Sequence, residues 1–145
     1  MNRPKEINIV IGIGIFAVTA FTTYWLLWFA VPGVVQSRMP GDPGFAIYEA
    51  FEMAFLLSDA FVAAAALAGV IGLWAMKDWG LLAMLLAAGG AIFLGLEDLL
   101  FDLENQMFVP FSSAAMVELA IVLILLSLGP VMTVLLWKHR KELIR

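Results

Sequence analysis

Four long apolar stretches dominate the pattern of hydrophobic and polar positions along the chain. They cover residues 7–31, 47–76, 79–101 and 111–137, and each is at least as long as the roughly twenty apolar residues that a membrane-spanning helix needs. Only short polar segments separate them. The pattern predicts an all-α integral membrane protein with a single domain over residues 1–145, in which four transmembrane helices form an up-down antiparallel bundle.

The composition supports a chain that lies mostly within lipid. Hydrophobic residues make up 63% of the sequence and the mean hydropathy is +1.00, whereas a soluble domain is nearer half apolar. The chain has no cysteine, which excludes disulfides, thiolate metal sites and iron–sulfur clusters. A net charge of −4 gives no support to nucleic-acid binding. The expected partner is the lipid bilayer of the cell membrane, and a multi-pass chain this small is expected to work as a homo-oligomer.

Basic residues predict how the chain crosses the membrane, because cytoplasmic flanks collect Lys and Arg. Seven of the eight bases lie in the two terminal segments and the second connection: Arg3, Lys5, Lys77, Lys138, Arg140, Lys141 and Arg145. The remaining base, Arg38, lies in the first connection. We therefore expect both termini inside. Tyr24, Trp25 and Trp28 then fall near the outer boundary, where we interpret the two Trp residues as interfacial anchors.

Small residues at every fourth position predict which helix faces meet, since helices in lipid associate through close backbone approach. One such ladder lies in the second stretch and another in the third: Ala60, Ala64, Ala68 and Gly72, then Ala83, Ala87, Ala91 and Gly95. The turn at Lys77 and Asp78 joins the two stretches, so we expect these ladders to pack against each other. Gly12 and Gly14 form a weaker small-residue face in the first stretch.

Acidic residues gather in the outer half of the predicted bundle. With a rise of 1.5 Å per residue, the side chains of Glu52, Asp98 and Glu118 fall on the order of 10 Å below the outer boundary, and Asp59 about twice as deep. Candidate residues for binding a cation or another ligand share this half of the bundle: Glu49, Glu52, Asp59, Glu97, Asp98, Asp102, Glu118 and Tyr24.

These acids are not equivalent. Asp59 and Glu118 are expected to be functional, because an acid in the membrane interior costs roughly 2.5–3.5 kcal/mol and usually faces a cavity or a partner. Glu49, Asp102 and Glu104 lie close enough to the interface to be simply solvated. Asp98 and Asp102, four residues apart, fall on the small-residue side of their helix, whereas Glu97 points to a neighbouring flank. His139, within KHRK, is interpreted as part of an interfacial basic cluster rather than as a ligand.

Lys and Arg are missing from the predicted membrane interior, so its carboxylates need another form of compensation. They must be protonated, hydrated in a water-filled vestibule, or neutralised by a bound cation. An all-oxygen set suits Ca²⁺, Mg²⁺, Mn²⁺ or Na⁺ and argues against zinc, copper or haem. We expect Glu52, Asp98 and Glu118 to be the metal ligands, because they come from three helices at one depth.

The leading functional prediction is an externally open acidic cavity that binds a cation, in a small transporter, channel or ion-regulated module. One alternative is a binder of a cationic amphiphile or lipid, in which apolar walls hold the tail and an acid pairs with the amine. Another is an accessory subunit of a larger membrane complex. The sequence has no Ser/His/Asp set, reactive Cys or phosphate loop, so enzymatic activity is not expected, although paired carboxylates could modify a lipid.

Overall fold

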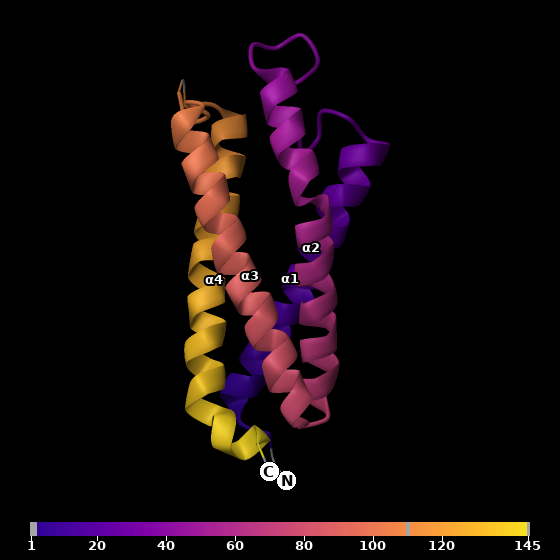
Figure 1. Ribbon diagram of the computed structural model, residues 1–145, viewed down its shortest axis with the longest axis vertical. Coiled ribbons are helices and arrows are strands. Elements are labelled where there is room, and N and C mark those ends of the chain that lie inside the picture. The colour runs from indigo at the N-terminus through magenta and orange to yellow at the C-terminus, as the bar shows by residue number, and fades with distance from the viewer. Residues whose placement is uncertain (1–2, 110, 145) are drawn as a thin grey trace.

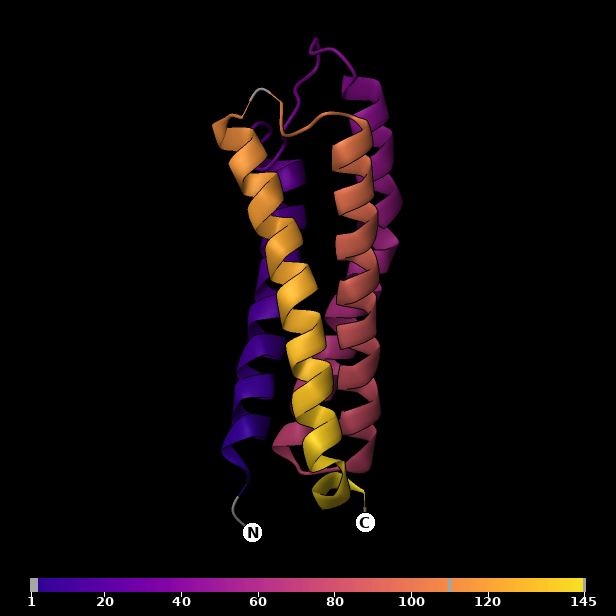
Figure 2. The same ribbon diagram turned by 90° about the vertical axis from the view of Figure 1, so that its left-hand side faces the viewer.

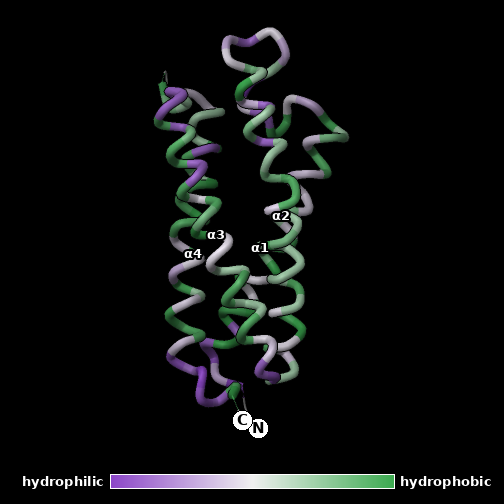
Figure 3. The backbone as a smooth tube through the Cα atoms, viewed as in Figure 1, coloured by the Kyte–Doolittle hydropathy of each residue, from purple (hydrophilic) through white to green (hydrophobic). Residues whose placement is uncertain are grey.

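The computed structural model describes residues 3–109 and 111–144, and within them the chain forms four long helices (Figure 1). These are α1 (Lys5–Ala30), α2 (Phe45–Trp74), α3 (Asp78–Glu104) and α4 (Ser113–Leu143). All four are long and apolar enough to cross a membrane, which confirms the predicted all-helical class and the character of a multi-pass membrane protein. Figure 3 shows the corresponding apolar middle section, with hydrophilic residues concentrated towards the two ends.

Local sequence sets where the helices begin and end. Gly44, with a φ of 77°, adopts the left-handed conformation that glycine tolerates and precedes α2. Met76 also has a positive φ, 51°, in the turn that ends α2 and leads within three residues into α3. The hydroxyl oxygen of Ser112 accepts a hydrogen bond of 3.2 Å from the backbone N–H of Ala115, which caps the start of α4.

Each helix packs most closely against its neighbours in the chain, and α1 also meets α4 over a smaller contact. Both termini and the α2–α3 turn lie at one end of the molecule, which we call the terminal end (Figure 1). Residues 31–44 and 105–109 lie at the opposite end, the loop end. The α1–α2 pair and the α3–α4 pair diverge towards the loop end, as Figure 1 shows, and α4 also leans away from α3 there, as Figure 2 shows.

Close approach of backbones holds α2 and α3 together near the terminal end. A Cβ atom added to Gly69 would lie 2.8 Å from Cβ and 2.9 Å from Cα of Met84. One added to Gly80 would lie 2.6 Å from Cα of Gly72. These separations are shorter than carbon–carbon contacts of about 3.5–4.0 Å, so only glycine fits at this crossing.

The small-residue ladder predicted on α2 is wrong except at Gly72. Ala60 and Ala64 are exposed and Ala68 is half-buried, whereas Gly72 is buried against Gly80 of α3. The other buried small residues of this stretch, Ala66 and Gly69, lie outside the predicted ladder. The buried stripe of α2 therefore runs through Asp59, Val62, Ala66 and Gly69 rather than through every fourth alanine. On α3, Ala87, Ala91 and Gly95 of the predicted ladder are all buried, but a Cβ at Gly95 would meet Leu125 and Leu126 of α4 rather than α2.

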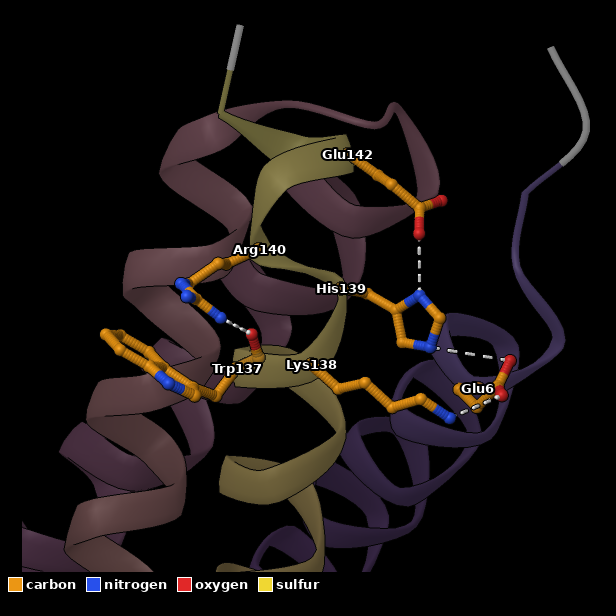
Figure 4. A network of polar contacts seen from close by, with 6 residues as sticks. All are labelled: Glu6, Trp137, Lys138, His139, Arg140 and Glu142. Carbon is orange, nitrogen blue, oxygen red and sulfur yellow. Dashed lines mark hydrogen bonds and ion pairs between the residues drawn. The ribbon is translucent and has the colours of Figure 1, made fainter.

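Polar side chains join α1 to α4 at the terminal end (Figure 4). The carboxylate of Glu6 lies 3.4 Å from Nζ of Lys138 and 3.6 Å from Nε2 of His139. The other ring nitrogen of His139, Nδ1, lies 2.8 Å from Oε1 of Glu142. The predicted interfacial basic cluster thus contains the histidine, but acids on both sides of the ring partly neutralise that cluster.

Candidate functional site

A cavity of about 180 Å³ lies among all four helices, and carboxylates occupy one part of its wall. Glu52 and Asp59 come from α2, Asp98 from α3 and Glu118 from α4. Because the spacing of seven residues between Glu52 and Asp59 is about two helical turns, both side chains lie on the same face of α2. Four of the predicted site acids therefore line a single space, and they are close enough to repel one another.

Neighbouring side chains hydrogen-bond to three of these four acids. The hydroxyl of Tyr24 donates to Glu52 over 2.8 Å, and the indole N–H of Trp25 donates to Asp59 over 2.9 Å. The hydroxyl of Ser37 donates to Glu118. The donors are neutral, so they orient the carboxylates without cancelling their charge.

Asp98 makes no side-chain hydrogen bond or ion pair with any other residue that the structure describes, although it lines the cavity. Asp102 lies one turn further along α3 and is only 3% exposed. Within residues 3–109 and 111–144, Oδ2 of Asp102 has no hydrogen-bond partner. Two carboxylates on this face of α3 therefore carry acceptor capacity that the described side chains leave unused.

The described part of the chain places no basic side chain in the wall of the cavity. Of the residues in 3–109 and 111–144 that line it, none is Lys, Arg or His. Arg38 is the only base of the α1–α2 connection. Its Nη2 donates a hydrogen bond of 3.0 Å to the backbone oxygen of Asn105, and its Nη1 donates to the backbone oxygen of Pro43. Its Nε lies 3.2 Å from Sδ of Met107. Arg38 thus holds the two loops together.

The remaining wall of the cavity is apolar or aromatic. Phe21 and Phe55 lie beside the acids in the lining, and the cavity continues along α1 to Ile13 and along α4 to Met132. Ile13 and Tyr24 are eleven residues apart on one helix, a separation of about 16 Å at 1.5 Å per residue. The site is therefore elongated, with acids towards the loop end and hydrocarbon towards the terminal end.

The other predicted site residues lie partly inside and partly outside the cavity lining. Tyr24 lines the cavity, whereas Glu97 and Glu49 do not, and Glu49 is exposed as expected for a solvated acid. Glu104 is exposed as well. The expectation that Asp102 is solvated is wrong, because the residue is buried, with only 3% of its surface exposed.

Sequence reasoning missed two hydrogen-bond donors. Trp25 is 9% exposed and bonds Asp59, so its interpretation as an interfacial anchor is wrong. The sequence does contain an indication of this orientation, because Trp25 follows Phe21 by one helical turn and so lies on the side of the helix that also carries Tyr24. Ser37 lies in the irregular connection, where no periodicity indicates which way a side chain points.

Within the described residues, no three His, Cys, Asp or Glu side chains are grouped closely enough to hold a metal ion together. The expectation that Glu52, Asp98 and Glu118 bind a hard cation stays a prediction. Comparison of the chain with protein-family models, curated proteins and solved structures finds no match.

Proposed function

We propose that this protein binds a cation in the acidic part of the cavity, within the membrane-spanning region. The observation that carries the proposal is the convergence of Glu52, Asp59, Asp98 and Glu118 on a cavity whose described lining contains no basic residue. Uncompensated carboxylates in a low-dielectric interior are costly and usually face a partner. A cation relieves both their mutual repulsion and the loss of solvation.

The proposed topology is an up-down antiparallel bundle in the cell membrane, with both termini in the cytoplasm. Support comes from the position of the termini and the Lys77 turn at one end of the molecule, where six of the seven predicted cytoplasmic bases are described. The acidic part of the cavity then lies nearer the external side. A reporter fused after the last residue that is active only outside the cytoplasm should give no signal, and a strong signal would reverse this topology.

Calorimetry and thermal melts on chelator-treated protein in nanodiscs test the proposal. We expect saturable binding of at least one cation among Ca²⁺, Mg²⁺, Mn²⁺, Na⁺ and organic ammonium ions, with a melting temperature that rises with ligand concentration. Asp98→Asn and Glu118→Gln should weaken this binding. Glu104→Gln is the matched control, because it removes an acid of α3 that is exposed and outside the cavity lining.

Each result has a distinct meaning. Saturable binding that is lost in the two cavity variants and kept in the control supports the proposal. Binding that Glu104→Gln weakens as strongly would indicate a diffuse surface effect and contradict the proposed site. If neither the metal ions nor the organic ammonium ions give saturable binding, the acids are a proton site or a hydrated vestibule, and the proposal is wrong.

A further inference from the structure

We infer that the cation is an organic ammonium ion with an apolar body, and that it enters the cavity from the bilayer between α1 and α4. This inference rests on the proposed cation site and adds the class of ligand and its route.

The size and lining of the cavity fit a ring-sized apolar group. A cavity of about 150 Å³ lined by apolar side chains is known to hold benzene, and the cavity here measures about 180 Å³. Apolar residues, among them Ile13 of α1 and Met132 of α4, line the part of the cavity beyond the acids. A bare metal ion would leave this hydrocarbon wall unused, whereas an ammonium ion with an attached ring would contact both parts.

Aromatic rings beside the acids favour an ammonium ion in particular. Phe21, Tyr24 and Phe55 line the cavity together with the carboxylates. The faces of aromatic rings attract quaternary ammonium groups, and the attraction is stronger where water is excluded. Carboxylates supply the neutralising charge, and the rings supply contact surface for methyl groups that cannot donate hydrogen bonds.

The rim of the cavity opens towards lipid between α1 and α4. Phe16 of α1 is 47% exposed and Ile124 of α4 is 41% exposed, yet both line the cavity. Ala20, one turn after Phe16, is also exposed and also lines it. These two helices make the smallest contact of the neighbouring pairs, so the bundle is least closed along this edge.

The loop end of the cavity is covered by the connection between α1 and α2. Ser37 reaches across to Glu118 on α4, and its backbone N–H donates 3.0 Å to the hydroxyl of Tyr48 on α2. Arg38 bonds the backbone of Asn105 after α3. This cover bridges the two diverging helix pairs. The lateral route therefore differs from the external opening that the sequence predicts.

The unused acceptor capacity on α3 is independent support for a ligand at this end. Asp102 is 3% exposed, Oδ2 lacks a partner among the described residues, and the carboxylate lies near Asp98 and Glu118. Buried carboxylate oxygens are nearly always bonded, so a lone one indicates a missing partner. A positive group beside Asp98 and Glu118 would also attract Asp102.

Benzyltrimethylammonium is the probe for the ligand class, since it joins one ring to one quaternary charge. Two comparison compounds dissect it: tetramethylammonium keeps the charge without the ring, and neopentylbenzene keeps the shape without the charge. In nanodiscs of zwitterionic lipid, we expect benzyltrimethylammonium to bind at least about tenfold more tightly than tetramethylammonium, and neopentylbenzene not to compete. Asp98→Asn and Glu118→Gln should each weaken its binding by about tenfold.

The outcomes separate this inference from the proposed function. If Ca²⁺, Mg²⁺, Mn²⁺ or Na⁺ binds saturably and benzyltrimethylammonium neither binds nor displaces it, the cation site stands and the organic ligand is wrong. If tetramethylammonium binds as tightly as the benzyl compound, the apolar wall plays no part and the inference is wrong. If no compound binds, both proposals are wrong.

A pair of alanine variants tests the route. Ala20→Phe adds bulk at the rim, and Ala120→Phe adds the same bulk to an exposed position of α4 that does not line the cavity. Binding can be followed by stopped-flow fluorescence, because Trp25 contacts Asp59 in the cavity wall. We expect Ala20→Phe to slow association of benzyltrimethylammonium by about tenfold and Ala120→Phe to leave it unchanged. Equal rates in the two variants would overturn the lateral route.

Discussion

Replacing Gly80 with Ala should separate α2 from α3 at their closest approach. The added methyl group would lie 2.6 Å from Cα of Gly72 and closer still to the adjoining backbone atoms of Gly72 and Leu73. All three contacts are with backbone, so no side chain can rotate away to make room. Carbon atoms normally lie about 3.5–4.0 Å apart, and the two helices must therefore move apart by about 1 Å.

The expected loss of stability follows from two opposing terms. Overpacking costs about 1–3 kcal/mol, and a clash with rigid backbone belongs at the upper end of that range. Alanine favours a helix over glycine by about 1 kcal/mol, which offsets part of the loss. The net decrease in the free energy of unfolding should be about 2 kcal/mol. Gly69→Ala should act in the same direction, because a Cβ there meets the backbone of Met84 at 2.9 Å.

Two other helical glycines provide the controls. A Cβ at Gly12 or Gly89 has nothing within 4 Å, so Gly→Ala there gains helix propensity without a clash. Unfolding in mixed micelles with increasing dodecyl sulfate, followed by tryptophan fluorescence, should give a higher midpoint for Gly89→Ala and a lower one for Gly80→Ala. The free energies of unfolding of these two variants should differ by about 3 kcal/mol. Equal midpoints for Gly80→Ala and Gly89→Ala would refute the close approach.

Two further predictions concern the hydrogen bonding of the buried acids. Trp25→Phe removes the donor to Asp59 and should lower the free energy of unfolding by about 1–3 kcal/mol. Trp28→Phe is the control, because the Trp28 ring is comparably buried and its indole N–H has no hydrogen bond among the described residues. The control should lose less stability in the same melt, and the reverse order would contradict the bond from Trp25 to Asp59. Asp102→Asn should raise the melting temperature, because the amide keeps the shape of the side chain, removes the repulsion from Glu118 and can donate a hydrogen bond to it. A lower melting temperature would mean that Asp102 has a cationic partner.

The sequence predicts the helices well because length and apolarity alone determine membrane-spanning segments. The predicted range 79–101 compares with α3 at Asp78–Glu104, and 111–137 with the longer α4 at Ser113–Leu143. α4 is longer because helix formation continues through the polar residues near Lys138, which hydropathy excludes from a span. Polar helical turns beyond the hydrocarbon have no apolar signal to mark them.

The side of each helix that points into the bundle is harder to predict from this sequence than the residues at which the helix begins and ends. Alanines are so frequent in α2 that a spacing of four can be found on more than one face, and only the structure selects Ala66 and Gly69 over Ala60 and Ala64. The acids Glu52 and Asp59 are rarer and mark their face without ambiguity. Helical periodicity also places Asp102 on the same side of α3 as Asp98, and its burial was missed because its estimated depth, close to the interface, suggested solvation.

One stripe of α2 explains both the tight packing and the cavity. Its residues recur at alternating spacings of three and four, which keeps them on one side of the helix: Glu52, Phe55, Asp59, Val62, Ala66, Gly69 and Leu73. Towards the terminal end this stripe contains Ala66 and Gly69, which let α3 approach, with Met84 against Gly69. Towards the loop end the same stripe carries larger side chains, where the helix pairs diverge and the cavity lies. Side-chain volume along a single face thus places the carboxylates of Glu52 and Asp59 in a space that close packing cannot fill.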